Sequence, residues 1–83
     1  MAKQVTIYST PACGYCRMAK EFFKEENIEY TEYDVQADPS KAQEMIKKSG
    51  QMGVPVIVVS GEGSEEQMFV GFDRQALSEA LGI

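Results

Sequence analysis

Segments with a strand pattern and segments with a helix pattern alternate along this chain, and their order constrains the fold more than any other feature. The sequence predicts strands over residues 3–9, 28–35, 54–60 and 67–70, and helices over residues 14–26, 39–49 and 74–81. A strand, a helix and a strand joined by a right-handed crossover form a parallel pair, and a turn at residues 61–63 adds antiparallel pairing. The order β-α-β-α-β-β-α therefore predicts an α/β domain, a four-stranded mixed sheet flanked by three helices on its two faces.

The composition of the strands indicates how each one lies in the sheet. Val5 and Ile7 alternate with Thr6 and Tyr8, which predicts that the two pairs face opposite sides. The continuous apolar run at residues 54–60 is typical of a strand that is buried on both faces at the centre of a sheet. This run carries a proline near its start, one of the few strand positions that tolerate the residue.

Each predicted helix has a cap and an apolar stripe. Asp38 and Pro39 are favourable residues for the start of the second helix and Gly50 for its end, while Asp73 caps the third helix. Asn27 is expected to end the first. The residues expected to face the core are Met18, Ala19, Phe22 and Phe23 in the first helix, Ala42, Met45 and Ile46 in the second, and Leu77, Ala80 and Leu81 in the third.

Length and charge exclude several classes of protein. The 83 residues suffice for one domain, residues 1–83. The net charge of −5 disfavours a nucleic-acid partner, because phosphate backbones repel an acidic chain. No apolar run approaches the ~20 residues that span a bilayer, so we expect no membrane partner. The first residues lack the apolar stretch of a secretory signal, and we expect a cytoplasmic location.

The only two cysteines, Cys13 and Cys16, lie at the start of the first predicted helix. Two thiols this close cannot join distant segments, so their spacing indicates redox chemistry or a metal site. Helix-start N–H groups and the helix dipole favour a thiolate at Cys13, and Arg17 and Lys20 add positive charge. Cys16 is expected to be more buried and to ionise less. We therefore expect Cys13 to attack a disulfide and Cys16 to resolve the mixed disulfide.

Other interpretations of the cysteine pair are weaker. The chain has no histidine, which excludes a cysteine–histidine hydrolase. Structural zinc needs four ligands, and two thiolates supply only half of them, so we expect no metal site within one chain. Two merely structural, buried thiols would not need to lie at the turn between a strand and a helix.

Three segments resemble the glutaredoxin family. Residues 8–16, YSTPACGYC, are similar to its active-site segment, residues 49–55, SGQMGVP, to its second motif, and residues 70–73, VGFD, to its third. They occur in the order and spacing of the family. The resemblance is strongest to short bacterial glutaredoxin-like proteins, which grade into the redoxins that supply ribonucleotide reductase. It implies the thioredoxin fold and a thiol–disulfide oxidoreductase that acts on disulfide-containing proteins.

The resemblance also implies a set of substrate-binding and glutathione-binding residues. A cis peptide bond before the proline of the second motif would lie opposite the cysteines, and the preceding residue would pair its backbone with a substrate peptide. The third motif would bind the γ-glutamyl end of glutathione, because helix-start N–H groups suit a carboxylate and an aspartate suits an ammonium group. The residues so implied are Tyr15, Val54, Pro55, Gly71, Phe72 and Asp73.

Four positions depart from the pattern of the family. Thr10 stands where the family usually has a lysine that pairs with the glycine carboxylate of glutathione, and Ala42 where relatives often carry arginine or glutamine. Val70 replaces a glycine, and its larger side chain narrows the part of the site expected to bind the γ-glutamyl end of glutathione. Gly14 replaces the usual proline, which loosens the active-site turn. Thr10 and Arg17 are therefore treated only as possible contributors to the site.

These departures leave the electron donor open. Tyr15 and residues 72–73 favour glutathione as reductant or cosubstrate, whereas Thr10 and Ala42 favour a thioredoxin reductase. We expect a monomer without a tightly bound cofactor. An alternative is an iron–sulfur cluster carrier, in which two chains each supply Cys13 and two external thiols complete the ligand set. Some relatives carry selenocysteine at the first cysteine position.

Overall fold

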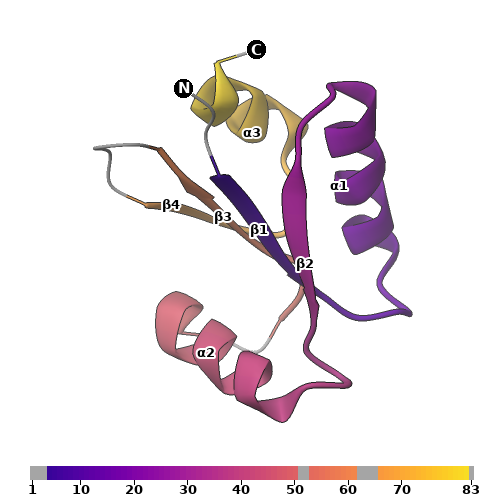
Figure 1. Cartoon of the computed structure of the whole chain (residues 1–83), viewed down its shortest axis with the longest axis vertical. Coiled ribbons are helices and arrows are strands. Elements are labelled where there is room, and N and C mark those ends of the chain that lie inside the picture. The colour runs from indigo at the N-terminus through magenta and orange to yellow at the C-terminus, as the bar shows by residue number, and fades with distance from the viewer. Residues whose placement is uncertain (1–3, 51–52, 62–65, 83) are drawn as a thin grey trace.

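The computed structural model describes residues 4–50, 53–61 and 66–82, and its elements follow the predicted order (Figure 1). In chain order they are β1 (Gln4–Ser9), α1 (Gly14–Glu25), β2 (Tyr30–Asp34), α2 (Pro39–Ser49), β3 (Val56–Ser60), β4 (Gln67–Val70) and α3 (Arg74–Leu81). Lys3 of the first predicted strand and Gly63 of the predicted turn lie outside the described residues. Among the helices described, none is both long and apolar enough to cross a membrane.

The strands form one mixed sheet in the order β2-β1-β3-β4. β1 pairs with β2 in parallel and with β3 in antiparallel orientation, and β3 pairs with β4 in antiparallel orientation. Tyr8 lies opposite Val56, which in turn lies opposite Val70. The C-terminal end of β1, the N-terminal end of β3 and the C-terminal end of β4 therefore lie side by side at one end of the sheet. The predicted mixed sheet and the central place of β3 are confirmed.

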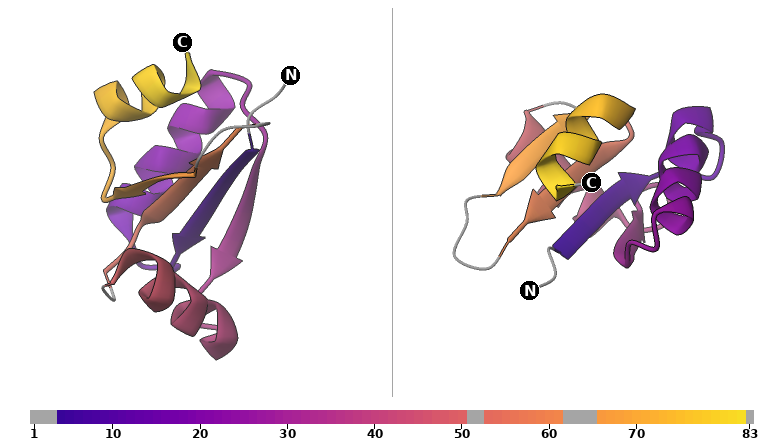
Figure 2. Two further views of the ribbon diagram at one scale, coloured as in Figure 1. Left: turned by 90° about the vertical axis from the view of Figure 1, so that its left-hand side faces the viewer. Right: turned by 90° about the horizontal axis from the view of Figure 1, so that it is seen from above.

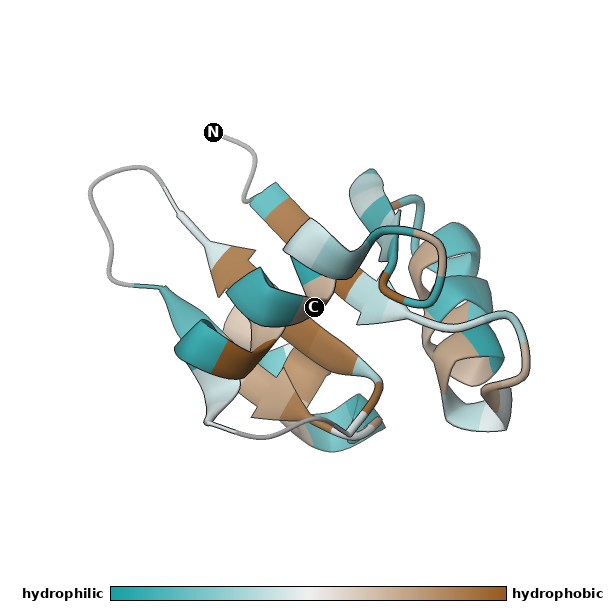
Figure 3. Ribbon diagram, turned by 90° about the horizontal axis from the view of Figure 1, so that it is seen from below, coloured by the Kyte–Doolittle hydropathy of each residue, from teal (hydrophilic) through white to brown (hydrophobic). Residues whose placement is uncertain are grey.

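Helices cover both faces of the sheet (Figures 1 and 2). The core under α1 and α3 consists of Val5, Ile7, Ala19, Phe22, Phe23, Ile57, Val59 and Leu77. The core under α2 consists of Tyr8, Met45, Val56 and Val58. The alternation of β1 thus sends Ile7 to one face and Tyr8 to the other, as predicted. In Figure 3 the strongly hydrophobic colour follows the strands between the helices.

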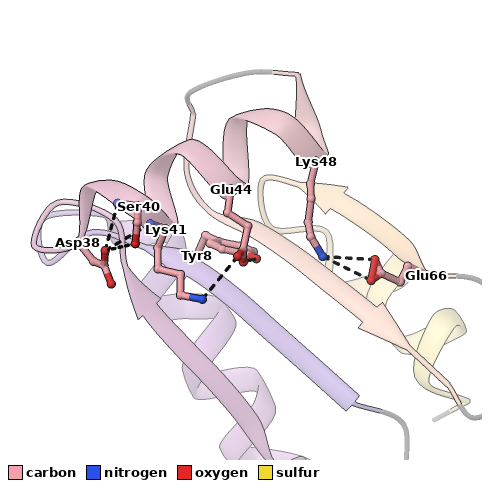
Figure 4. A network of polar contacts seen from close by, with 7 residues as sticks. All are labelled: Tyr8, Asp38, Ser40, Lys41, Glu44, Lys48 and Glu66. Atoms are coloured by element: carbon pink, nitrogen blue, oxygen red, sulfur yellow. Dashed lines mark hydrogen bonds and ion pairs between the residues drawn. The ribbon is translucent and has the colours of Figure 1, made fainter.

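Polar contacts join α2 to its face of the sheet (Figure 4). The hydroxyl of Tyr8 donates a hydrogen bond to the carboxylate of Glu44. That carboxylate also lies 3.5 Å from Nζ of Lys41, and Nζ of Lys48 lies 3.4 Å from the carboxylate of Glu66 beside β4. α2 is therefore held by side-chain polar groups as well as by its buried methionine.

The predicted helix caps are confirmed. The carboxylate of Asp38 accepts hydrogen bonds from two N–H groups of the first turn of α2, and Pro39 follows it. Gly50 ends α2 in the left-handed region, with φ of 76°. Asp73 accepts a hydrogen bond from the N–H of Ala76 at 3.1 Å and so starts α3. These residues fix both ends of α2 and the start of α3.

Two strand starts were predicted too early. β2 begins at Tyr30 because the chain is still closing the end of α1: Asn27 is left-handed with φ of 57°, and the N–H of Ile28 donates to the carbonyl of Phe23 at 2.8 Å. β3 begins at Val56 because Pro55 has no N–H to donate to the sheet.

Two residues predicted to face the core are exposed. Met18 is 48% exposed and Ile46 is 36% exposed. Successive helical residues differ by about 100° in direction, so the neighbour of a buried residue can point away from the sheet. The stripes that are buried run through Cys16, Ala19 and Phe23 in α1 and through Met45 in α2. The predicted stripes were too wide by one residue each.

Candidate active site

Cys13 lies at the junction between the loop that follows β1 and the start of α1. Its N–H donates to the carbonyl of Thr10 at 3.2 Å, which closes a turn around Pro11 and Ala12. Its own carbonyl accepts the first helical hydrogen bond, from the N–H of Arg17 at 3.2 Å. Cys13 is extended, with φ of −85° and ψ of 114°, and it is the N-cap residue of α1. The sequence places a sulfur where helices usually carry a capping oxygen.

The two cysteines differ in environment. The sulfur of Cys13 accepts a hydrogen bond from the N–H of Cys16 at 3.1 Å. Cys13 is partly exposed, whereas Cys16 is 0% exposed. An N–H group of the first helical turn therefore points at the sulfur of Cys13, and of the two cysteines only Cys13 is open to solvent. The predicted difference in burial is confirmed.

Burial also sets the protonation of Cys16. Burial first, and then the hydrogen bond with Cys13, raise the pKa of the Cys16 thiol to about 12. The backbone of Thr10 and the charge of Lys20 lower the pKa of this thiol, but they do not cancel the effect of burial. At neutral pH the proton stays on Cys16, so the exposed sulfur of Cys13 is the one available to a substrate.

The residues of the second and third motifs lie at the end of the sheet where β1 leads to the cysteines. The peptide bond between Val54 and Pro55 is cis, as the resemblance implied. Pro55 is buried, and its carbonyl accepts a hydrogen bond from the N–H of Gly71 at 2.8 Å. Gly71 adopts φ of 84°, a conformation that side chains disfavour. Half-buried Val54 and the Gly71 turn are thus held together beside the start of β3, next to the end of β1.

Phe72 and Asp73 are fixed by contacts of their own. The ring of Phe72 packs against Phe22 of α1, with 5.9 Å between the ring centroids. One carboxylate oxygen of Asp73 caps α3 through Ala76. The third motif therefore joins the start of α3 to the helix that carries the cysteines. A role of these residues in binding glutathione stays a prediction.

The remaining predicted site residues surround the start of α1. Tyr15 lies in its first turn and is 63% exposed. Arg17 is also exposed, and Thr10 is half-buried. An exposed aromatic ring beside a partly exposed sulfur can contact a substrate without any movement of the core.

A polar cluster beside Cys16 contains Lys20, whose positive charge was predicted near the cysteines, and two residues that the sequence did not indicate, Glu32 and Ser9. Nζ of Lys20, one helical turn after Cys16, lies 2.7 Å from Oε2 of Glu32 in β2. The hydroxyl of Ser9, at the end of β1, donates to the same oxygen at 2.8 Å. Lys20 could be found from its spacing to Cys16, but Glu32 and Ser9 join it only through the pairing of β1 with β2. In the part of the chain that the structure describes, no three His, Cys, Asp or Glu side chains are grouped as a metal site.

Comparison with known proteins places this geometry among redox proteins. The sequence profile of the family described as Glutaredoxin matches residues 5–63. A glutaredoxin-like 8.6 kDa protein in the rubredoxin operon of Clostridium pasteurianum is 35% identical over 77 residues, which are 93% of this chain and 96% of that protein. Glutaredoxin 3 of Escherichia coli is 33% identical over 58 residues, 70% of each chain.

Solved structures share the fold. The thioredoxin-like protein BC3987 superposes with a TM-score of 0.80 at 28% sequence identity, covering 93% of this chain and 99% of that one. The predicted thioredoxin fold is therefore confirmed. The matched profile includes both cysteines and the cis-proline segment.

Proposed function

This chain belongs to the glutaredoxin family of redox proteins, and from that premise we propose that it reduces protein disulfides and glutathione mixed disulfides through a dithiol cycle. Cys13 is the attacking sulfur and Cys16 the resolving sulfur. The electron donor is glutathione. Disulfide-containing proteins are the substrates.

The asymmetry of the two cysteines is the observation that carries this proposal. An attacking sulfur must be reachable and must be stabilised as a thiolate, and the sulfur of Cys13 is partly exposed and accepts a helix-start N–H at 3.1 Å. A resolving sulfur needs only to reach its partner. Cys16 lies one helical turn away from Cys13, so its sulfur can reach that of Cys13. Because Cys16 is buried, its sulfur is also protected from other disulfides.

The cycle follows from thiol–disulfide exchange. The thiolate of Cys13 attacks one sulfur of the substrate disulfide, which forms a mixed disulfide and releases the other sulfur as a thiolate. The thiolate of Cys16 then attacks the sulfur of Cys13, which forms the Cys13–Cys16 disulfide and releases the second substrate thiolate. Two glutathione thiols, acting in turn, reduce this disulfide and leave as glutathione disulfide. Two electrons pass from glutathione to the substrate.

The arrangement of the second and third motifs supports glutathione as donor. Val54 and Gly71 are held at the edge of the sheet where β1 leads to Cys13, and Tyr15 is exposed beside this cysteine. A tripeptide could add to the backbone of Val54 as an extra strand. Its γ-glutamyl end could then reach Asp73 and the N–H groups at the start of α3.

NADPH consumption during disulfide reduction tests the donor. Reduction of a small disulfide would be followed with glutathione and glutathione reductase, and separately with thioredoxin reductase. Turnover with glutathione alone is the expected result. Turnover with thioredoxin reductase alone would contradict the glutathione assignment, and with it the roles of Tyr15 and Asp73.

Trapping of mixed disulfides tests the roles of the cysteines. Cys16→Ser should accumulate a mixed disulfide on Cys13 when the protein is exposed to glutathione disulfide, because no second sulfur can resolve it. The increase in mass of one glutathione would be measured by intact-protein mass spectrometry. The matched variant Cys13→Ser should gain no glutathione, because its remaining thiol is buried and protonated. Equal labelling of both variants would contradict the assignment.

A further inference from the structure

The resolving step depends on the sulfur that is less able to ionise. Cys16 must attack as a thiolate, yet it is 0% exposed and its pKa is raised to about 12 by burial and by its hydrogen bond with Cys13. The backbone of Thr10 and the side chain of Lys20 lower the pKa of this thiol. Of these, only Lys20 carries a charge. Among the residues that the structure describes, Lys20 is a cation whose charge favours the anion of this buried sulfur.

Lys20 is well placed for this task because it follows Cys16 by four residues in α1. Helical residues four apart are neighbours on one face. Cys16 and Lys20 both lie on the side of α1 that faces the sheet, where Cys16 is buried and Lys20 is half-buried. A long side chain here can cover the buried sulfur with its methylene groups while its ammonium stays at the edge of the core.

Glu32 of β2 holds the ammonium of Lys20, and Ser9 of β1 in turn holds Glu32. Oε2 of Glu32 accepts hydrogen bonds from Nζ of Lys20 at 2.7 Å and from the hydroxyl of Ser9 at 2.8 Å. Ser9 is buried, and it is the last residue of β1 before the loop to the cysteines. Glu32 is therefore fixed from the sheet side and in turn fixes Lys20. The three residues join β1, β2 and α1 beside the resolving cysteine.

We propose that Lys20, held by Glu32 and Ser9, stabilises the thiolate of Cys16 in the resolving step. This inference rests on the proposed dithiol cycle and adds a specific cation to it. Lys20 acts by its charge on the reacting sulfur, while Glu32 and Ser9 are positioning residues that act through Lys20.

The step balances without any further reactant. Cys16 loses its proton to water, and its sulfur electron pair forms the bond to the sulfur of Cys13. The bond between Cys13 and the substrate sulfur breaks, and the substrate leaves as a thiolate that takes a proton from water. The two protein sulfurs are oxidised to a disulfide, and the substrate sulfur is reduced. Lys20 neither gains nor loses a proton.

Proton transfer to the cluster itself is disfavoured by its own contacts. The hydrogen bond with Glu32 raises the pKa of Lys20, so its amine stays protonated and cannot act as a base. Hydrogen bonds from Lys20 and then Ser9 lower the pKa of Glu32, which makes its carboxylate a poor proton acceptor. The charge of Tyr30 further raises the pKa of Lys20, and the charge of Lys24 further lowers the pKa of Glu32. The cluster is suited to supply a fixed charge.

The reaction with dipyridyl disulfide separates the two steps. This neutral disulfide is not attracted by charge, and it releases one pyridinethione chromophore when Cys13 attacks and a second when Cys16 resolves. In stopped-flow measurements, the first phase should scale with reagent concentration and the second should not. Cys16→Ser should retain only the first phase, which identifies the second phase as the resolving step. If the intact chain lacks a second phase that is independent of concentration, the dithiol cycle itself is overturned.

Lys20→Met, which keeps the length of the side chain but removes its charge, tests the inference. We expect its second phase to be about three- to ten-fold slower at neutral pH, because each unit of pKa changes the thiolate fraction ten-fold and the greater nucleophilicity of a more basic thiolate offsets part of this. The first phase should change less than the second, because Lys20 lies one helical turn from Cys16 but two turns from Cys13. Lys20→Arg should restore the second phase to within about two-fold, since it keeps the charge.

Salt and a matched lysine distinguish charge from structure. The second phase of the intact chain should slow as ionic strength rises, because salt screens a half-buried ammonium, and that of Lys20→Met should respond less. Lys24→Met removes the same charge one turn further from Cys16 and should leave the second phase unchanged. A second phase that Lys20→Met leaves within two-fold, or that Lys24→Met slows equally, would overturn the inference while leaving the dithiol cycle intact.

A double-mutant cycle tests the positioning role of Glu32. Glu32→Gln should slow the second phase about two-fold in the intact chain, because Lys20 is no longer held by a charge-assisted bond. It should have no effect in a chain that also carries Lys20→Met, because Glu32 acts only through the lysine. A faster second phase in Glu32→Gln would show that the carboxylate merely screens Lys20, and would overturn the positioning role.

Discussion

α1 and α2 cover opposite faces of one sheet, but they are held there in different ways. α1 buries Cys16, Ala19, Phe22 and Phe23, and it shares an apolar core with α3. α2 buries only Met45, and hydrogen bonds and ion pairs from its polar residues reach the sheet. Apolar packing dominates on one face, and polar contacts are added to a smaller apolar core on the other.

This difference bears on the active site, because the two helices position different parts of it. α1 carries both cysteines, so the apolar core fixes the reacting sulfurs. α2 ends at Gly50, shortly before the segment that contains Val54 and Pro55. We therefore expect changes that loosen α2 to affect the binding of substrate peptide more than the reactivity of Cys13.

Truncation of one buried side chain on each face is the strongest test of this comparison. Phe23→Ala should lower the free energy of unfolding by about 3–5 kcal/mol, because a fully buried ring leaves a cavity among rigid neighbours. Met45→Ala should lower it by about 2–3 kcal/mol, at the lower end for such a change, because α2 can move to fill the space. Urea unfolding followed by far-ultraviolet circular dichroism measures both.

Equal losses in the two variants would show that the faces are packed alike. The thiol reactivity of Cys13 serves as the control. It should fall in Phe23→Ala, whose cavity lies under the helix that carries the cysteine, and persist in Met45→Ala. A loss of reactivity in both variants would contradict the separate roles of the two helices.

The sequence patterns predicted much of the difference between α1 and α2, but not all of it. The period of the strands and the caps at Asp38, Gly50 and Asp73 located every element, because these signals depend on neighbours in the sequence. The exposure of Met18 and Ile46 could not be predicted, because it depends on where each helix axis lies over the sheet. A periodic stripe does not contain that information.

The site was predictable to the extent that it is local. The positions of Cys13 and Cys16 follow from the strand–turn–helix pattern, and their difference in burial follows from helix geometry. The contacts of Glu32 depend on the register between β1 and β2, in which it lies opposite Ile7. An acidic residue in an edge strand gives no local sign of a partner in a helix, so this cluster was missed.

Removal of one hydroxyl tests the polar attachment of α2. Tyr8→Phe should lower the free energy of unfolding by about 1 kcal/mol, because it deletes the hydrogen bond to Glu44 and retains the buried ring. Glu44→Gln should lower stability less, since an amide oxygen still accepts the bond. No change in Tyr8→Phe at neutral pH would mean that packing alone holds α2.

The same contact predicts a pH dependence. The hydrogen bond from Tyr8 lowers the pKa of Glu44, so its contribution is present above the unfolded value of about 4.3 and is lost as pH falls through the folded value. Burial and Glu44 raise the pKa of Tyr8, so its contribution is present below about pH 10 and is lost as pH rises beyond that.

Urea unfolding at a series of pH values measures this dependence. The deficit of Tyr8→Phe relative to the intact chain should be largest near neutral pH and should shrink at both extremes. A constant deficit from acid to alkaline pH would show that the loss comes from the space left by the hydroxyl and not from the charge of Glu44.

An effect of similar size is expected at the C-terminal end of α2. Gly50→Ala should lower stability by about 1 kcal/mol, because φ of 76° disfavours a side chain, and no heavy atom lies within 4 Å of the position that a Cβ would take. Gly14→Ala is the matched control, since a Cβ there also meets nothing within 4 Å but the backbone is not left-handed. It should be neutral or slightly stabilising. Similar losses in both variants would point to the removal of glycine in general, and not to the left-handed end of α2.

The smallest effect is expected for the ion pair of Lys48 near the C-terminal end of α2. Lys48 and Glu66 lie 3.4 Å apart and both are substantially exposed, so solvent and salt screen their attraction. Lys48→Met should lower stability by about 0.5 kcal/mol or less, and the loss should vanish in high salt. A larger loss, or one that salt leaves unchanged, would mean that the aliphatic part of Lys48 packs against the sheet. The attachment of α2 would then be more apolar, and closer to that of α1, than its buried residues indicate.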